Sequence, residues 1–186
     1  MTNGTQTPTL ASAEAMQVAR YLLSTRFSTP NGRNGLWHWR GNFYEWYGET
    51  WQKRDREWIE SALWVALENV TFSQATQNGN RQVRFAPSIP KVQGVMRALQ
   101  AVQTLPHERS PVWLTAPQTK QTQTLVSFRD KILDAKTGDE YKRDETFFDP
   151  HVLPCNYDPN AECPKWMQCL DEWGGGDPQW ATLLQR

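Results

Sequence analysis

The sequence predicts an α+β domain in which amphipathic helices pack on a small antiparallel β-meander, followed by a Pro-rich C-terminal segment. Three observations predict it: apolar residues at helical spacing in three segments, an aromatic hairpin pattern between the first two, and prolines concentrated after residue 150. The 186 residues, 38% of them apolar, suffice for one domain with a hydrophobic core. Ten tryptophans exclude a disordered body for the chain.

The N-terminal part predicts a tail and then a helix. Residues 1–11 are rich in Thr, Asn, Gly and Pro and are expected to be a disordered tail. Apolar residues from Ala15 to Leu23 follow a helical stripe, with Ser12 as candidate N-cap. The Pro30-Asn31-Gly32 cluster is expected to terminate this helix.

A Gly41-Asn42 turn between aromatic runs predicts the first hairpin of the meander. In that register Trp39 faces Tyr44, Trp37 faces Trp46, and His38 faces Glu45 as a cross-strand polar pair. The other face then carries Leu36, His38, Arg40, Phe43, Glu45 and Tyr47. A second turn at Gly48-Glu49 would place Trp51 opposite Trp46.

Two more helical stripes follow, one from Asp55 to Val70 and one after Pro90 to Val102. The polar segment 73–80 between them is expected to be an exposed loop, and 118–124 a polar connector. Residues 124–139 predict short strands and turns, and residues 165–173 a helix. Gly174-Gly175-Gly176 predicts a linker, and Trp180, Leu183 and Leu184 begin another amphipathic pattern.

Charge and hydropathy limit the functional class. Twenty Lys and Arg balance twenty Asp and Glu, which excludes a globally basic nucleic-acid binder but not a local basic patch. No apolar run is long enough to span a membrane, and the first residues do not resemble a signal peptide, so we expect a cytoplasmic protein without a membrane partner. Three cysteines without such a signal predict reduced thiols.

Motifs for catalysis are absent from the sequence. Neither a phosphate-binding glycine loop nor a Walker Lys-Ser/Thr occurs, so this chain alone is not expected to hydrolyse ATP. His151, Cys155, Cys163 and Cys169 are four candidate zinc ligands, but none of their gaps has the two-residue knuckle spacing, and we expect no metal site. The carboxylate pairs Asp144-Glu145 and Asp171-Glu172 are expected to serve solubility.

Basic and aromatic residues interleave between Arg33 and Arg56, a composition typical of single-strand nucleic-acid binding. A second basic group, Arg81, Arg84, Lys91 and Arg97, surrounds the entry to the third helix. The candidate DNA contacts are Arg33, Arg40, Lys53, Arg54, Arg84 and Lys91. Two alternatives stay open: the aromatics form the core face of the meander, and the basic residues form a solvated surface.

The C-terminal third carries a collinear series of short motifs that resembles a known family. The series comprises residues 128–138 ending in Thr137-Gly138, then Phe147-Phe148, Leu153-Pro154, Tyr157-Asp158-Pro159, Cys163-Pro164-Lys165-Trp166 and Leu184-Gln185. It resembles the N-terminal (D5_N-like) domain that precedes the superfamily 3 helicase core in phage and plasmid P4-type and poxvirus D5-type primase-helicases. Residues 41–51 resemble the family's aromatic hairpin and 91–102 its following helix. Asp130-Lys131 stands in place of the family's usual Asn-Gly, and Cys169 in place of an aromatic residue.

The resemblance implies a single accessory domain over residues 12–186, with 175–186 as the start of a linker to a helicase core. It implies a collar or DNA-feeding module of a ring-forming replicative helicase from a phage or mobile element, in a bacterial or phage-infected cell. The implied partners are single-stranded or forked DNA, the helicase core and neighbouring subunits. ATP and Mg²⁺ are expected only at that core, and any priming activity elsewhere. The alternative functions are a protein-interaction or oligomerisation module and, with zinc bound, a metalloenzyme fragment.

Overall fold

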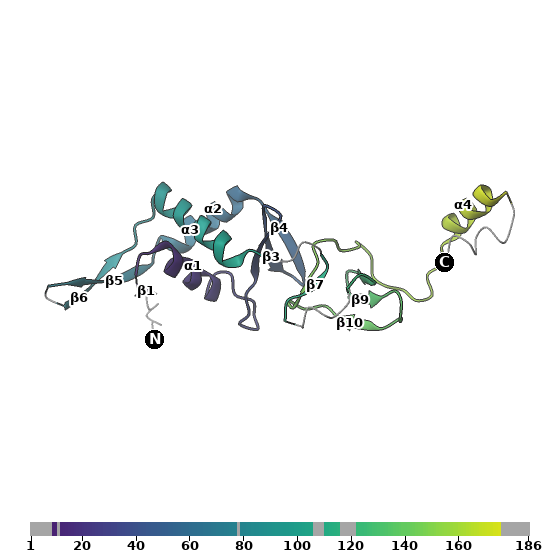
Figure 1. Ribbon diagram of the computed structural model, residues 1–186, viewed down its shortest axis with the longest axis horizontal. Coiled ribbons are helices and arrows are strands. Elements are labelled where there is room, and N and C mark those ends of the chain that lie inside the picture. Colours follow the sequence, from purple (N-terminus) through teal and green to yellow (C-terminus); the bar gives the residue numbers. More distant parts are fainter. Residues whose placement is uncertain (1–8, 11, 78, 106–109, 116–121, 176–186) are drawn as a thin grey trace, which may run out of the picture. The chain divides into compact units, whose positions relative to one another are not determined.

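The computed structural model describes residues 9–10, 12–77, 79–105, 110–115 and 122–175 (Figure 1). The chain forms two compact units, Met1–Cys155 and Asn156–Arg186. The described residues contain four helices and several small, mainly antiparallel sheets, which confirms the α+β class. No helix in this described part is long and apolar enough to cross a membrane.

The first helix, α1 (Ala15–Ser24), buries Val18, Ala19, Leu22 and Leu23 as the apolar stripe predicts. Its N-cap residue is Glu14 rather than Ser12, whose Oγ accepts a hydrogen bond from the Glu14 amide at 3.2 Å. Strand β1 (Thr9–Leu10) precedes it and pairs in parallel with β5 (Thr71–Thr76). Leu10 is 4% exposed, so the predicted disordered tail is wrong for Thr9 and Leu10. The reason is that β5, distant in sequence, completes a core for Leu10.

The meander consists of β2 (Leu36–Trp39), β3 (Asn42–Tyr47) and β4 (Thr50–Arg54). Its first turn is Arg40-Gly41, not Gly41-Asn42, and both turn residues have positive φ, 47° and 79°. The predicted pairs Trp39–Tyr44, Trp37–Trp46 and His38–Glu45 are therefore wrong. Trp37 faces Tyr44, His38 faces Phe43 and Leu36 faces Glu45. The second turn and the Trp46–Trp51 pair are confirmed.

Both faces of the meander are covered. Leu36 and Phe43 belong to the main core, together with buried residues that include Val18, Ile59 and Leu99. Trp39, Tyr44 and Trp51 belong to a second cluster with Leu105 and Phe148. The Phe148 ring makes edge or tilted contacts with all three at 5.4–5.7 Å between centroids. The meander is thus the layer between two hydrophobic clusters.

Helix α2 (Arg56–Leu67) begins where Asp55 caps it, since the Asp55 Oδ1 accepts the Trp58 amide at 2.7 Å. Helix α3 (Ile89–Gln103) packs against α1 and α2 and carries Pro90 in its first turn. Both predicted helices are confirmed. The exposed loop predicted for residues 73–80 is wrong, because β5 pairs with β6 (Gly79–Arg84) in a hairpin (Figure 1).

The rest of the first unit is built from short strands. Strands β8 (Leu125–Ser127), β9 (Lys131–Asp134) and β10 (Glu140–Lys142) form one sheet. Strand β7 (Val112–Trp113) pairs with β11 (Phe147–Phe148). These strands confirm the prediction for residues 124–139, whereas most of the predicted connector 118–124 lies outside the described residues.

The second unit contains α4 (Pro164–Gly174), which confirms the helix predicted over 165–173. It begins after Cys163 with proline in its first turn and ends at Gly175, whose φ of 60° is left-handed. Trp166, Met167 and Trp173 are exposed, and the two tryptophan rings meet edge to face at 6.0 Å. The predicted pattern at Trp180, Leu183 and Leu184 lies outside the described residues.

Candidate nucleic-acid interface

The six predicted DNA contacts come from separate elements of the first unit. Arg33 lies between α1 and β2, Arg40 in the β2–β3 turn, and Lys53 and Arg54 on β4. Arg84 is the last residue of β6, and Lys91 lies in the first turn of α3. Because a phosphate backbone is attracted by net positive charge, the partner of each side chain decides what it contributes.

Arg54 is held by a buried carboxylate. Its Nε donates to Oε2 of Glu45 at 2.8 Å, and Oε1 of the same carboxylate accepts from Nη1 of Arg26 at 3.1 Å. The Cζ atoms of both arginines lie over the Trp58 ring, at 4.5 Å for Arg54 and 5.4 Å for Arg26. Glu45 therefore neutralises part of the charge of Arg26 and Arg54. It also links β4 to the segment between α1 and β2, which carries Arg26.

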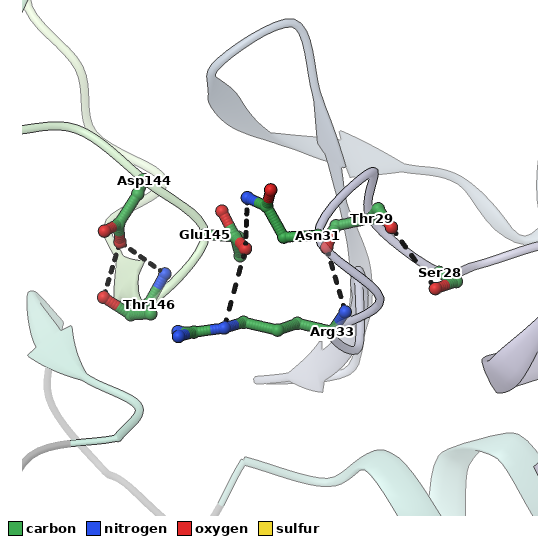
Figure 2. Close-up of polar contacts among 7 residues, drawn as sticks. All are labelled: Ser28, Thr29, Asn31, Arg33, Asp144, Glu145 and Thr146. Carbon is green, nitrogen blue, oxygen red and sulfur yellow. Dashed lines mark hydrogen bonds and ion pairs between the residues drawn. The ribbon is translucent and has the colours of Figure 1, made fainter.

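Arg33 is paired with a carboxylate far along the chain (Figure 2). Its Nε lies 3.7 Å from Oε1 of Glu145, and the Asn31 side-chain amide donates to the same oxygen at 2.9 Å. Glu145 is 5% exposed, so the solubility role predicted for this residue is wrong. Its neighbour Asp144 accepts from the Thr146 backbone amide at 2.8 Å and also from the Thr146 hydroxyl, which orders a local turn.

Arg40 and Lys53 lie near one edge of the aromatic cluster. Cζ of Arg40 is 4.6 Å from the centroid of the Trp39 ring, and Lys53 is paired with Tyr44 across the strands. Burial raises the pKa of the Tyr44 hydroxyl, and the positive charge of Arg40 partly opposes that shift. Both basic side chains are exposed.

Arg84 and Lys91 bond to neutral backbone carbonyls, and in the described part of the chain neither forms an ion pair. Nε and Nη2 of Arg84 donate to the Glu68 carbonyl at 3.1 and 3.0 Å. Nζ of Lys91 donates to the carbonyls of Phe85 and Ala86 at 2.7 and 3.1 Å and lies over the Phe85 ring. Each side chain thus fixes its own segment while adding positive charge to the surface.

The segment that carries these two residues lacks carboxylates altogether. Residues 69–107 contain no Asp or Glu, although the whole chain has twenty. Within this segment Arg81, Arg84, Lys91 and Arg97 are exposed on β6 and α3. A neutral protein therefore carries a local concentration of positive charge on these elements.

The aromatic residues are mainly core rather than a stacking platform. Trp39, Tyr44 and Trp51 are buried, and the indole Nε1 of Trp51 donates to the Phe147 carbonyl at 2.9 Å. Trp37 and Trp46 are half-buried and pack on the same cluster. Of the two interpretations that the sequence leaves open for these aromatics, the structure favours the core face of the meander.

The candidate zinc ligands belong to both units of the chain, and His38 lies in the meander. His151 and Cys155 belong to the first unit, and Cys163 and Cys169 to the second. The described residues contain no group of three or more His, Cys, Asp or Glu side chains arranged to hold a metal ion. His38 packs on the Phe43 ring at 5.0 Å, and burial lowers its pKa while a hydrogen bond to the Gly41 backbone partly offsets this.

Other buried polar groups in the first unit serve local structure. Oδ2 of Asp149 accepts from the Ser127 hydroxyl at 2.5 Å, and Oδ1 accepts from the His151 amide at 2.9 Å. Nη1 of Arg143 donates to the Phe128 carbonyl at 2.7 Å. Burial lowers the pKa of Arg143, and the charges of Asp149 and Glu49 oppose the shift. Asp149 thus ties β8 to the segment after β11, and Arg143 ties the β8–β9 turn to the segment between β10 and β11.

A family model described as D5 N terminal like matches residues 25–173, from the end of α1 into α4. The matched region covers more than half of the chain and contains all six predicted contacts. A search of curated proteins found no match.

Proposed function

Because the chain belongs to the D5 N terminal like family, whose members are N-terminal domains of primase-helicase-like proteins, we propose that it is an accessory DNA-binding domain of a replicative helicase or primase-helicase. In this proposal the whole protein comes from a phage or other mobile element and works in the cytoplasm of its host. The chain binds DNA and supports the ring, while ATP and Mg²⁺ act at a separate helicase core.

One observation carries the DNA-binding role: residues 69–107 combine exposed basic side chains with a complete lack of carboxylates. Such a segment attracts the phosphate backbone of either single-stranded or forked DNA without reading its sequence. The twenty acidic residues elsewhere keep the protein neutral overall, so the attraction is strongest at this segment.

The six candidate residues divide by their partners. Arg40, Lys53, Arg84 and Lys91 are exposed, so they are the proposed phosphate contacts. For Lys53, Arg84 and Lys91 no carboxylate lies within ion-pair distance in the described part of the chain. Arg33 and Arg54 contribute less, because Glu145 and Glu45 already neutralise them.

The test is a salt titration of fluorescently labelled single-stranded and forked DNA binding to the full chain. Lys53→Gln and Arg84→Gln should each weaken binding and reduce the slope of log K against log salt by about one. Arg54→Gln should change the slope less, and Arg129→Gln, an exposed arginine outside the acid-free segment, is the matched control. Absence of binding by the wild-type chain even at low salt would contradict the proposal.

A second candidate function is a protein-interaction module. It is favoured by α4, on which Trp166, Met167 and Trp173 are exposed at 49%, 52% and 65%. Mass measurement across a range of protein concentrations tests it. Association that Trp173→Ser abolishes, without any effect on DNA binding, would support this function alongside the first.

A further inference from the structure

The β5–β6 hairpin exposes polar side chains that the fold itself does not use. Its base is anchored by Phe72, which packs on the main core, and the residue opposite Phe72 is the half-buried Val83. Beyond them, the described residues from Gln74 to Gln82 are all exposed. Both faces of this outer ribbon are therefore open to solvent, and Figure 1 shows β5 and β6 running out beyond the helices of their unit.

The outer ribbon is rich in hydrogen-bond donors and contains no carboxylate. Gln74 on β5 lies directly opposite Arg81 on β6, and the next pair is Ala75 with Asn80. In the described part of the chain the side chains of Gln74, Asn80 and Arg81 have no hydrogen-bond or ion-pair partner. Gln82, by contrast, is engaged, because its Oε1 accepts from the Thr71 hydroxyl at 2.9 Å.

The Gln74–Arg81 pair offers the side-chain chemistry that reads base edges. Arg forms bidentate hydrogen bonds with guanine, and Gln with adenine, on the major-groove side. Opposed residues of an antiparallel pair have Cβ atoms roughly 5 Å apart, which lets both side chains reach neighbouring base pairs.

The shape of the ribbon agrees with that groove. The major groove of B-form DNA is about 12 Å wide and admits a two-stranded β-ribbon, whereas the minor groove is about half as wide. A ribbon exposed on both faces enters without displacing other parts of the protein. Arg84, at the base of the ribbon, then lies where a groove is bordered by phosphates.

We propose that the β5–β6 hairpin inserts into the major groove of duplex DNA, with Gln74 and Arg81 at the base edges and Arg84 at the phosphate backbone. This inference rests on the proposed DNA-binding function and adds a duplex contact to it. On a forked substrate the hairpin engages the duplex arm.

The experiment compares three labelled DNAs bound by the full chain: a duplex, a single strand of the same length, and a duplex whose cytosines carry bulky glucosyl groups in the major groove. The variant is Gln74→Ala with Arg81→Glu, and the control is Arg129→Glu, which makes the same charge change at an exposed turn of another sheet. Thermal unfolding verifies that both variants remain folded.

The expected result is a loss of duplex affinity of roughly tenfold or more for the double variant, with single-strand affinity changed by no more than about twofold. The wild-type chain should bind the glucosylated duplex about as weakly as the double variant binds the plain duplex. Arg129→Glu should leave the preference between duplex and single strand unchanged.

Three outcomes overturn the inference. If the double variant loses affinity equally for duplex and single strand, Arg81 contributes only non-specific electrostatic attraction. If the wild type binds the glucosylated duplex as tightly as the plain duplex, the hairpin does not enter the major groove. Wild-type association through the exposed β6 edge, abolished by the double variant while duplex binding stays unchanged, would assign the hairpin to contacts between copies. In each case DNA binding itself persists, whereas a wild type that binds no DNA at low salt contradicts the proposed function.

Discussion

Glu45 and Arg54 form a 2.8 Å ion pair between adjacent strands of the meander, in a position where the carboxylate is only 7% exposed. The same carboxylate binds Arg26, so one buried negative charge holds two guanidinium groups that lie over the Trp58 ring. This relationship makes Arg54 mainly a structural residue, although its sequence context is that of a DNA contact.

The first prediction follows from that pairing. Glu45→Gln should lower the free energy of unfolding by about 2–3 kcal/mol, because two hydrogen bonds to charged groups are weakened and two cations remain close together. Urea denaturation measures the change. Glu140→Gln is the control: its ion pair with Lys131 is equally short at 2.7 Å but exposed, so its loss should cost less than about 1 kcal/mol. Equal effects at both positions would show that burial of Glu45 does not strengthen the pair.

The second prediction concerns two glycines with different surroundings. A Cβ at Gly35 would lie 2.9 Å from the Phe27 carbonyl oxygen and 3.1 Å from Cγ2 of Thr29, so Gly35→Ala should destabilise the fold by about 1–3 kcal/mol. Gly94 lies inside α3, where a new Cβ would meet only the Ala15 Cβ at 3.8 Å. Gly94→Ala should therefore stabilise the protein by up to about 1 kcal/mol. Thermal unfolding of the two variants should shift in opposite directions, and a stabilised Gly35→Ala would contradict the close approach.

The sequence predicted the helices and the meander well because their signals are local. The apolar stripes of α1, α2 and α3 and the cap at Asp55 depend on residues within a few positions of one another. Although the predicted position of the first turn was wrong, each side chain of β2 and β3 was assigned to the correct face of the meander. Moving the turn to Arg40-Gly41 changes the pairing by two residues, and side chains alternate with a period of two.

The sequence failed where polar strands or distant partners decide the structure. β5 and β6 lack the alternation of a half-buried strand because most of their residues are exposed on both faces. The Asn78-Gly79 dipeptide was the signal that could have indicated the hairpin. For the candidate site, basic residues were visible but their carboxylate partners were not. Glu145 is 114 positions from Asn31 in the chain, and no local pattern connects them.

The third prediction addresses backbone strain between β6 and α3. Ala86 has a φ of 46°, a left-handed conformation that costs an L-residue roughly 1–2 kcal/mol. Ala86→Gly should raise the free energy of unfolding by about 0.5–1 kcal/mol, since glycine adopts this conformation without the Cβ clash. Ala101→Gly, at an exposed position inside α3, should lower it by about the same amount. Denaturant unfolding of both variants is the measurement, and destabilisation by Ala86→Gly would show that the turn is not strained.

The fourth prediction is a pH dependence from His38. Burial holds the pKa of this imidazole below its ordinary value of 6.5. Between these two pKa values the imidazole is mainly neutral in the folded protein and mainly protonated in the unfolded chain. The free energy of unfolding should therefore decrease as the pH falls below 6.5, until the pH passes the lowered pKa of the folded state. The slope is at most about 1.4 kcal/mol per pH unit for one group.

His38→Gln removes the titrating group and should flatten the stability curve between pH 7 and 5 relative to the wild type. Denaturant unfolding at several pH values measures the difference, and His151→Gln, which removes an exposed imidazole, is the control variant. Because the wild type and both variants carry the same carboxylates, the difference between curves isolates the imidazole. A wild-type slope that survives His38→Gln would mean that another buried group sets the acid sensitivity of the fold.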